Sequence, residues 1–216
     1  MTAHDHDHGQ RKEPDARTPA EYWEARYADG RTRWSGNVNA SLATEVAALA
    51  PGTALDVGCG QGGDAIWLAT RGWTVTATDV AQSALDTGAE RAAAAGVAAA
   101  ITWEQHDLGV SFPAGTFDLV TTSFLHSPVE LPRTAILRRA AAAVAPGGTL
   151  LVIGHAPSAT HAHADLPTAE DVVADLALPA DEWTVRTCAL VEVEHAFAGE
   201  APARRTDAVV RYERRA

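Results

Sequence analysis

One short stretch constrains the fold of this chain more than any other: an apolar run that ends in a loop of four glycines. Residues 54–57 are apolar except for Asp56, and a helical pattern begins at residue 63. The glycines of this stretch are Gly58, Gly60, Gly62 and Gly63. The pattern is typical of a buried parallel strand that turns sharply into a helix, with a backbone bare enough to touch a ligand. The stretch therefore predicts an α/β fold with a ligand site at the turn.

The glycine spacing by itself leaves two cofactors open. Gly58, Gly60 and Gly63 satisfy G-x-G-x-x-G, the fingerprint of dinucleotide-binding folds. With Gly62 as the third glycine, the same loop satisfies the G-x-G-x-G spacing of methyltransferases. Asp79 follows about 20 residues after the first glycine, where a carboxylate accepts ribose hydroxyls in NAD and in S-adenosylmethionine alike. The choice therefore depends on the rest of the chain.

The composition excludes several kinds of protein. The chain has 216 residues, enough for one well-buried domain, and its net charge of −11 disfavours nucleic acid as the main partner. No apolar run is long enough to span a membrane. Since the N-terminus lacks the apolar core of a secretion signal and only two cysteines occur, we expect a cytoplasmic protein without disulfides. Lys12 is the only lysine, which excludes a phosphate-loop lysine, a Schiff base and a Tyr-x-x-x-Lys dehydrogenase pair.

Three segments of the chain differ in character. Residues 1–17 are charged, alternate His with Asp and lack apolar periodicity, so we expect a disordered, solvated tail. Residues 18–40 combine a short helix over 19–28 with an aromatic loop around Trp34. A large flat side chain in a loop needs something to cover, so this segment is interpreted either as a lid or as packing on the core. Residues 41–216 form the main domain.

Strands and helices alternate along that domain. Apolar and β-branched runs predict strands over residues 53–57, 73–78, 101–105, 117–122 and 149–154. Helical patterns lie between them, over 63–70, 82–95 and from Pro132 to Val144. Two further strands, 183–197 and 208–213, follow a short helix and have no helix between them, which makes them antiparallel. The prediction is an α/β fold: a Rossmann-like, seven-stranded, mostly parallel sheet with helices on both faces and an antiparallel C-terminal hairpin.

Two side-chain features favour a methyl-donor cofactor over a dinucleotide. Asp56 directly precedes the glycines, where a carboxylate repels a pyrophosphate and attracts an ammonium group. The third predicted strand ends in His106-Asp107-Leu108, a polar and apolar set suited to the edge and face of adenine. With Leu55-Asp56-Val57-Gly58-Cys59-Gly60-Gln61-Gly62, Asp79, Phe117-Asp118-Leu119-Val120 and Pro146-Gly147-Gly148, the chain resembles the class I S-adenosylmethionine-dependent methyltransferases over about residues 40–216.

The resemblance implies a role for each matching residue. By the family pattern, Asp56 and the glycines hold the methionine part of S-adenosylmethionine, and Asp79 holds the ribose. Val80 and Leu108 flank the adenine, and Asp107 reaches its amino group. The candidate cofactor-binding residues are Trp34, Asp56, Gly58, Cys59, Gly60, Gly62, Asp79, Val80, Asp107, Leu108 and Ser123. Residues 41–216 are accordingly expected to be the methyltransferase domain.

A second, shorter resemblance concerns the substrate. Tyr22-Trp23 to Tyr27, followed by Trp34-Ser35-Gly36 and Asn39, is similar to small-molecule methyltransferases of the thiopurine and tellurite-resistance type. In that family, an N-terminal aromatic segment closes over the cofactor. The resemblance implies a small-molecule acceptor with a soft sulfur, selenium or tellurium nucleophile.

The candidate catalytic residues are two histidines that follow the fourth and fifth strands. His126 and His155 both end up above the carboxyl ends of those strands, and an imidazole that titrates near pH 6.5 suits a general base. Either one is alternatively a loop histidine bonded to backbone, and a soft nucleophile needs little or no base. His155, His161, His163 and Asp165 have metal-ligand side chains, but a substrate-covering loop is the favoured interpretation and no metal is expected.

Two other functions stay open at this stage. A nicotinamide-dependent reductase is compatible with the alternative glycine spacing, although the chain lacks a Tyr-Lys pair. A non-catalytic protein that binds S-adenosylmethionine is compatible with the same cofactor residues. The leading hypothesis is methyl transfer from S-adenosylmethionine to a small molecule.

Overall fold

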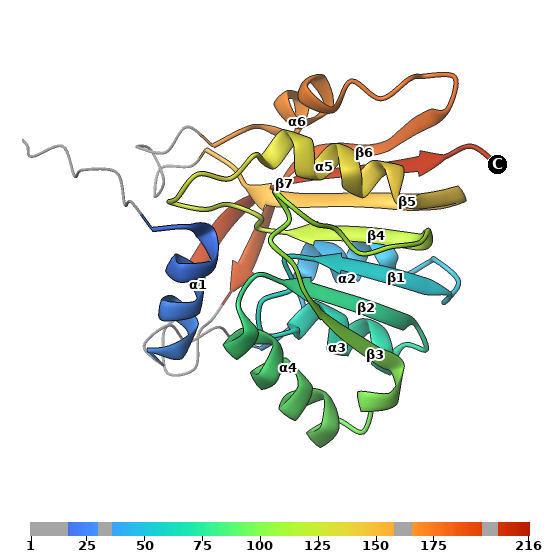
Figure 1. Cartoon of the computed structure of the whole chain (residues 1–216). Coiled ribbons are helices and arrows are strands. Elements are labelled where there is room, and N and C mark those ends of the chain that lie inside the picture. The colour runs from blue at the N-terminus through green and yellow to red at the C-terminus, as the bar shows by residue number, and fades with distance from the viewer. Residues whose placement is uncertain (1–16, 30–35, 158–165, 196–202) are drawn as a thin grey trace, which may run out of the picture.

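A computed structural model describes residues 17–29, 36–157, 166–195 and 203–216 of the chain. Within these residues, seven strands form one sheet in the order β3-β2-β1-β4-β5-β7-β6 (Figure 1). The strands are β1 (Thr53–Val57), β2 (Thr74–Asp79), β3 (Ile101–Gln105), β4 (Phe117–Ser123), β5 (Val144–His155), β6 (Trp183–His195) and β7 (Ala203–Arg214). The helices are α1 (Pro19–Ala28), α2 (Ala40–Val46), α3 (Gly63–Thr70), α4 (Gln82–Ala94), α5 (Arg133–Ala142) and α6 (Ala169–Leu176).

The sheet is parallel except at its C-terminal end. Parallel pairing joins β1 to β2 and β4, β2 to β3, and β4 to β5. Strand β7 runs antiparallel to both of its neighbours, β5 and β6. The predicted fold class is therefore confirmed. The strand order reverses between β1 and β4, and in open α/β sheets ligands bind at the carboxyl ends of strands at such a reversal.

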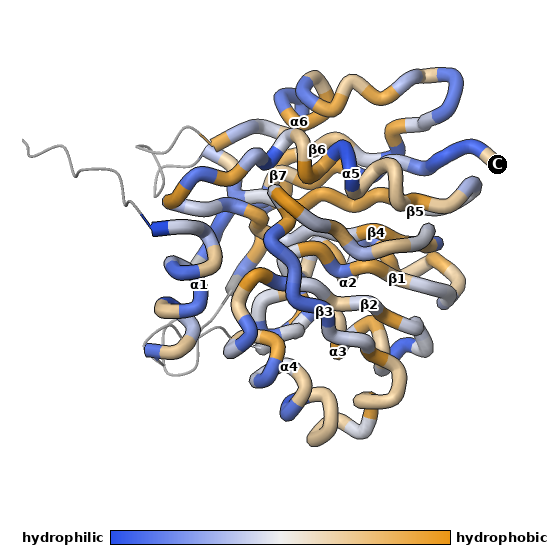
Figure 2. The backbone as a smooth tube through the Cα atoms, viewed as in Figure 1, coloured by the Kyte–Doolittle hydropathy of each residue, from blue (hydrophilic) through white to orange (hydrophobic). Residues whose placement is uncertain are grey.

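The core is split between the two faces of the sheet because successive side chains of a strand point to opposite sides. In β4, Val120 packs on the face covered by α5 and α6, whereas its neighbour Leu119 packs on the face covered by α2 and α3. Leu150 and Leu151 of β5 divide in the same way. Figure 2 shows hydrophobic residues, in orange, along β1, β4 and β5 in the middle of the sheet. Helices on both faces thus cover a sheet whose central strands are apolar on both sides.

Strand β5 differs from the prediction at its start. We expected a helix as far as Val144 and a strand from Thr149, but α5 ends at Ala142 and β5 begins at Val144. Val144 pairs with Phe117, and after a register shift Thr149 pairs with Leu119. The turn residues Pro146-Gly147-Gly148 therefore lie within an irregular start of the strand. Turn-forming residues predict a break in local structure, whereas the pairing on either side depends on the neighbouring strand.

Two further expectations concern the charged N-terminal tail and the absence of a membrane span. The charged tail of residues 1–17 lies outside the described residues except for Arg17. Among the helices that the structure describes, none is long and apolar enough to cross a membrane.

Leucine truncations test the packing of the central strand. Leu119 is fully buried in β4, so we expect Leu119→Ala to lower the free energy of unfolding by about 2–5 kcal/mol through lost burial and a cavity. Leu190 on the edge strand β6 is 51% exposed, and Leu190→Ala should change stability by less than about 1 kcal/mol. Denaturant unfolding of both variants measures the difference. Equal losses would contradict the assignment of Leu119 to the core.

Candidate active site

The turn from β1 into α3 has the conformation that its glycines predict. Gly58, Gly60 and Gly62 have φ angles of 72°, 52° and 77°, in the left-handed region that favours glycine. The amides of Gly58 and Cys59 both donate to the Thr78 carbonyl oxygen at 2.9 Å, which fastens the loop to the end of β2. The three glycines of the G-x-G-x-G spacing are thus the ones that need a positive φ.

The fourth glycine of the loop is required for a different reason. A Cβ atom added at Gly63 would lie 2.8 Å from the Asn37 carbonyl oxygen, so a side chain there would displace the segment that leads into α2. Gly63 has no positive φ. Close packing at this position therefore accounts for the second spacing, G-x-G-x-x-G, that the sequence also satisfies.

Asp79 at the end of β2 is held against the glycine loop. Its Oδ2 atom accepts from the Gly60 amide at 2.9 Å, and its Oδ1 atom accepts from the Ala81 amide at 3.0 Å. Burial raises the pKa of this carboxyl, while the backbone donors oppose that shift. Each carboxylate oxygen retains a further lone pair, so Asp79 is able to accept hydroxyl donors from a ribose.

Asp56 is an almost fully buried carboxylate at the end of β1. It is 2% exposed, and its Oδ2 atom has no hydrogen-bond partner. Burial raises its pKa well above the usual range, and the charges of Asp64 and Asp79 raise it further. A buried acceptor without a donor costs free energy, which a bound ammonium group would recover. Asp56 therefore fits the amino group of a methionine moiety.

Asp64 is a site residue that the sequence interpretation missed. It lies in the first turn of α3, buried, where its Oδ2 atom accepts from the Ser123 hydroxyl at 2.6 Å. Its Oδ1 atom accepts from the Asn39 amide at 2.7 Å. The carboxylate thereby connects the end of β4 and the start of α2 to the glycine loop. The available signal was an acidic residue directly after the last glycine, where the helix dipole favours a negative charge.

The predicted adenine residues lie together at the ends of β2 and β3. The His106 amide donates to the Asp79 carbonyl oxygen at 3.0 Å, and Gln105 Nε2 donates to the Val80 carbonyl oxygen at 3.0 Å. Leu108 is 6% exposed, and the Asp107 carboxylate accepts from the Gly109 amide. These bonds bring Val80, Asp107 and Leu108 to one end of the sheet beside Asp79.

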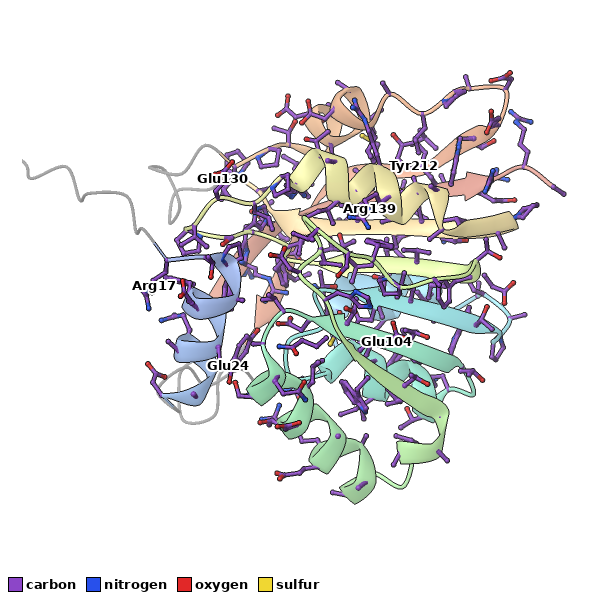
Figure 3. The ribbon with its side chains drawn as sticks, in the orientation of Figure 1. Arg17, Glu24, Glu104, Glu130, Arg139 and Tyr212 are labelled. Atoms are coloured by element: carbon purple, nitrogen blue, oxygen red, sulfur yellow. The ribbon has the colours of Figure 1, made fainter. Side chains whose placement is uncertain are left out.

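Helix α1 contacts three separate segments at this edge of the sheet (Figure 1). Trp23 Nε1 donates to Ser127 Oγ at 3.2 Å, in the loop after β4. The Glu24 carboxylate, labelled in Figure 3, accepts from the Ser83 amide at 3.3 Å, at the start of α4. A Cβ atom added at Gly60 would lie 2.8 Å from Tyr27 Oη, so the tyrosine hydroxyl lies against the glycine loop. Trp34, the other predicted aromatic residue, lies outside the described residues.

The two candidate catalytic histidines lie beside each other with Phe124. The His155 ring stacks on Phe124 with centroids 4.2 Å apart, and the His126 ring is 5.8 Å from His155. The His155 amide donates to His126 Nε2 at 3.3 Å. Burial, followed by the nearby charge of Arg133, lowers the pKa of His126 to about 4. His126 is therefore neutral at physiological pH and a weak base.

The ion pair between Arg205 and Asp207 also lies beside the Phe124 ring. The Arg205 guanidinium of β7 lies 4.6 Å from the Phe124 ring centroid and pairs with the fully buried Asp207 at 2.7 Å. Asp207 also accepts from the Ser41 hydroxyl at 3.1 Å. The β4, β5 and β7 ends are thus connected around one aromatic ring.

The remaining candidates are Cys59 and the metal-ligand side chains after β5. Burial raises the pKa of the Cys59 thiol well above its usual range, and neighbouring carboxylates add to this, so Cys59 stays protonated beside the loop. Among the described residues, no cluster of three metal-ligand side chains occurs. His161, His163 and Asp165 lie outside the described residues.

Comparison with known proteins agrees with this geometry. Residues 54–148 match a family model described as a methyltransferase domain, and no curated protein matches the sequence. A structure from work on the conversion of a disulfide bond into a thioacetal group during echinomycin biosynthesis is 23% identical, with a TM-score of 0.71 over 91% of this chain and 93% of that chain.

Two further solved structures share the fold. The N-methyltransferase NodS from Bradyrhizobium japonicum WM9, in complex with S-adenosyl-L-homocysteine, is 20% identical, with a TM-score of 0.65 over 91% of this chain and 99% of that one. TehB from Haemophilus influenzae is 14% identical, with a TM-score of 0.63 over 89% of this chain and 67% of that one. Residues 54–148, which include the glycine loop, therefore match a methyltransferase domain, and the chain shares its fold with the solved structure of a methyltransferase.

Proposed function

We propose that this enzyme transfers the methyl group of S-adenosylmethionine to a small-molecule acceptor whose nucleophile is sulfur, selenium or tellurium. The observation that carries this proposal is the weak basicity of His126, which lies beside the other candidate, His155, at the ends of β4 and β5. An acceptor that must lose a proton in the reaction requires a base whose pKa lies near the working pH. A soft nucleophile that is already ionised at neutral pH requires no such base.

The cofactor residues act by binding and alignment. We assign the ammonium group of the methionine moiety to Asp56, the ribose hydroxyls to Asp79, and the adenine to Val80, Asp107 and Leu108. When bound, S-adenosylmethionine supplies a methyl carbon on a positively charged sulfur, which keeps the bonding pair as the acceptor forms its bond to carbon. The buried carboxylates Asp56 and Asp79 favour a cationic ligand, since no cation contributes to the pKa shift of either one.

Residues 18–40 are assigned as a lid. The helix in this segment, α1, bonds to the loop after β4 through Trp23 and to the start of α4 through Glu24. The two partners, Ser127 and Ser83, lie far apart in the sequence, and α1 contacts both of them in one position. We assign this position as the closed state of the lid. A helix in that position limits the acceptor to a small molecule and keeps water from the transferring methyl group.

His126 and His155 are assigned to the acceptor side of the site. The Nε2 atom of His126 accepts from the His155 amide, which leaves the proton of the neutral ring on Nδ1. Phe124 provides an apolar surface against the His155 ring. We infer that these side chains orient the acceptor, with the reaction driven by alignment rather than by proton removal.

Removing the Asp79 carboxylate tests the cofactor assignment. In calorimetric titrations we expect S-adenosylmethionine to bind the wild-type protein and NAD not to bind. Asp79→Ala should weaken S-adenosylmethionine binding by about tenfold or more, because hydrogen bonds from the ribose to a charged acceptor are lost. Asp86→Ala removes an exposed carboxylate that accepts from Gln82 on α4 and serves as the matched control. Wild-type affinity in a folded Asp79→Ala variant, shown by thermal unfolding, would remove the ribose assignment.

The pH dependence of turnover tests the role of His126. Because its pKa is lowered to about 4, His126 is neutral above about pH 5, so kcat/KM for an aromatic thiol should follow only the ionisation of the thiol between about pH 6 and 9. His126→Asn should reduce kcat/KM by less than about tenfold through poorer positioning, without changing the shape of the profile. A loss of a hundredfold together with a disappearing ionisation would instead make His126 a general base.

A further inference from the structure

Arg133 places a positive charge at the acceptor side of the site. It is the first residue of α5 and is half-buried. Its Nε atom donates to the Leu125 carbonyl oxygen at 3.1 Å. A Cβ atom added at Gly154 would lie 3.1 Å from His126 Nε2 and 3.6 Å from Arg133 Nη2. The guanidinium and the His126 ring therefore meet at the same backbone position near the end of β5.

Leu125 connects this guanidinium to the glycine loop. The Leu125 side chain lies against that loop, because a Cβ atom added at Gly58 would be 2.8 Å from Leu125 Cδ1. Arg133 bonds to the carbonyl of this residue. Leu125 thus contacts both the guanidinium and Gly58, the first glycine of the loop.

Arg133 forms no salt bridge with a carboxylate among the residues that the structure describes. Among the residues that the structure describes, no Asp or Glu oxygen lies within the 4.0 Å ion-pair distance of its guanidinium, and the first turn of α5 holds no acidic residue. Arg205, on the other side of the same site, is paired with Asp207. Burial lowers the pKa of Arg133, and the charge of the exposed Asp175 on α6 opposes that shift without forming a salt bridge. The charge of Arg133 in turn contributes to the low pKa of His126. A half-buried cation without a salt-bridge partner has lost hydration that a directly bound anion is able to replace.

We propose that Arg133 binds an anionic oxygen group of the methyl acceptor, either the carboxylate of a thiol or selenol acid or an oxygen of a selenium or tellurium oxyanion. A guanidinium offers two parallel donors to such a group, which fixes its orientation as well as its position. An acceptor held in this way presents its nucleophile next to His126 and Phe124. The proposal rests on the proposed function, because it names the class of acceptor that the same site takes.

Binding measurements test the subsite without requiring turnover. The protein is first saturated with S-adenosyl-L-homocysteine and then titrated with 3-mercaptopropionate or with 3-mercaptopropanol, which differ in the carboxylate. We expect the acid to bind at least about tenfold more tightly than the alcohol, as is typical of charge-assisted hydrogen bonds. Arg133→Gln should abolish this difference, and Arg133→Lys should restore part of it. Arg138→Gln, which removes an exposed arginine from the same helix, should leave the preference for the acid intact.

Turnover assays then distinguish the two sources of the anion. If the acceptor is a thiol acid, Arg133→Gln raises KM for 3-mercaptopropionate more than it lowers kcat; if it is an oxyanion, the same change appears with tellurite. Equal binding of acid and alcohol to the wild-type protein, or an acid preference that survives Arg133→Gln, would overturn the proposal. A variant that loses affinity for S-adenosylmethionine but keeps the acid preference would assign the guanidinium to the cofactor carboxylate and also overturn it. Failure to methylate any sulfur, selenium or tellurium acceptor, with the binding preference intact, would contradict only the proposed function.

Discussion

The structure depends on how the β1–α3 turn is fastened to the end of β2. The amides of Gly58 and Cys59 share the Thr78 carbonyl oxygen, and the Gly60 amide bonds to the Asp79 carboxylate. A buried backbone amide without a partner costs free energy, so these bonds stabilise a turn whose own residues have little side chain to pack. The same bonds place a carboxylate beside bare backbone at the point where the strand order reverses. The hydrogen bonds that stabilise the turn therefore also build the candidate cofactor site.

Negative and positive side chains lie on opposite sides of the strand reversal in the candidate site. Three buried carboxylates, Asp56, Asp64 and Asp79, surround the glycine loop, and burial raises the pKa of each. Across the strand reversal, on the proposed acceptor side, lie Arg133 and Arg205. Among the described residues, Arg205 forms a salt bridge with a carboxylate and Arg133 does not. A cationic cofactor and an anionic acceptor would each meet the opposite charge, and the field between the two halves would orient them toward each other.

The elements of the fold were largely predictable from the sequence because their signals are local. The bounds predicted for β1, β3 and α3 agree with the structure, since each follows from apolar periodicity bounded by glycine or a turn. The start of β5 was predicted wrongly, because the pairing of Val144 with Phe117 involves a strand that lies earlier in the chain. Asp64 was missed because its partners, Asn39 and Ser123, are brought together only by folding. The roles assigned to the individual cofactor residues stay predictions.

The sequence by itself determined that the chain forms an α/β sheet with a glycine turn after β1, because a run of glycines after an apolar strand restricts the backbone wherever it occurs. It also determined which residue types lie at the strand ends. Only the tertiary structure decided their chemistry. Burial makes His126 a weak base, Asp207 pairs with Arg205, and Arg133 has no salt-bridge partner among the described residues. The physical reason is that basicity and charge compensation depend on what surrounds a group, and those surroundings come from strands and helices far apart in the chain.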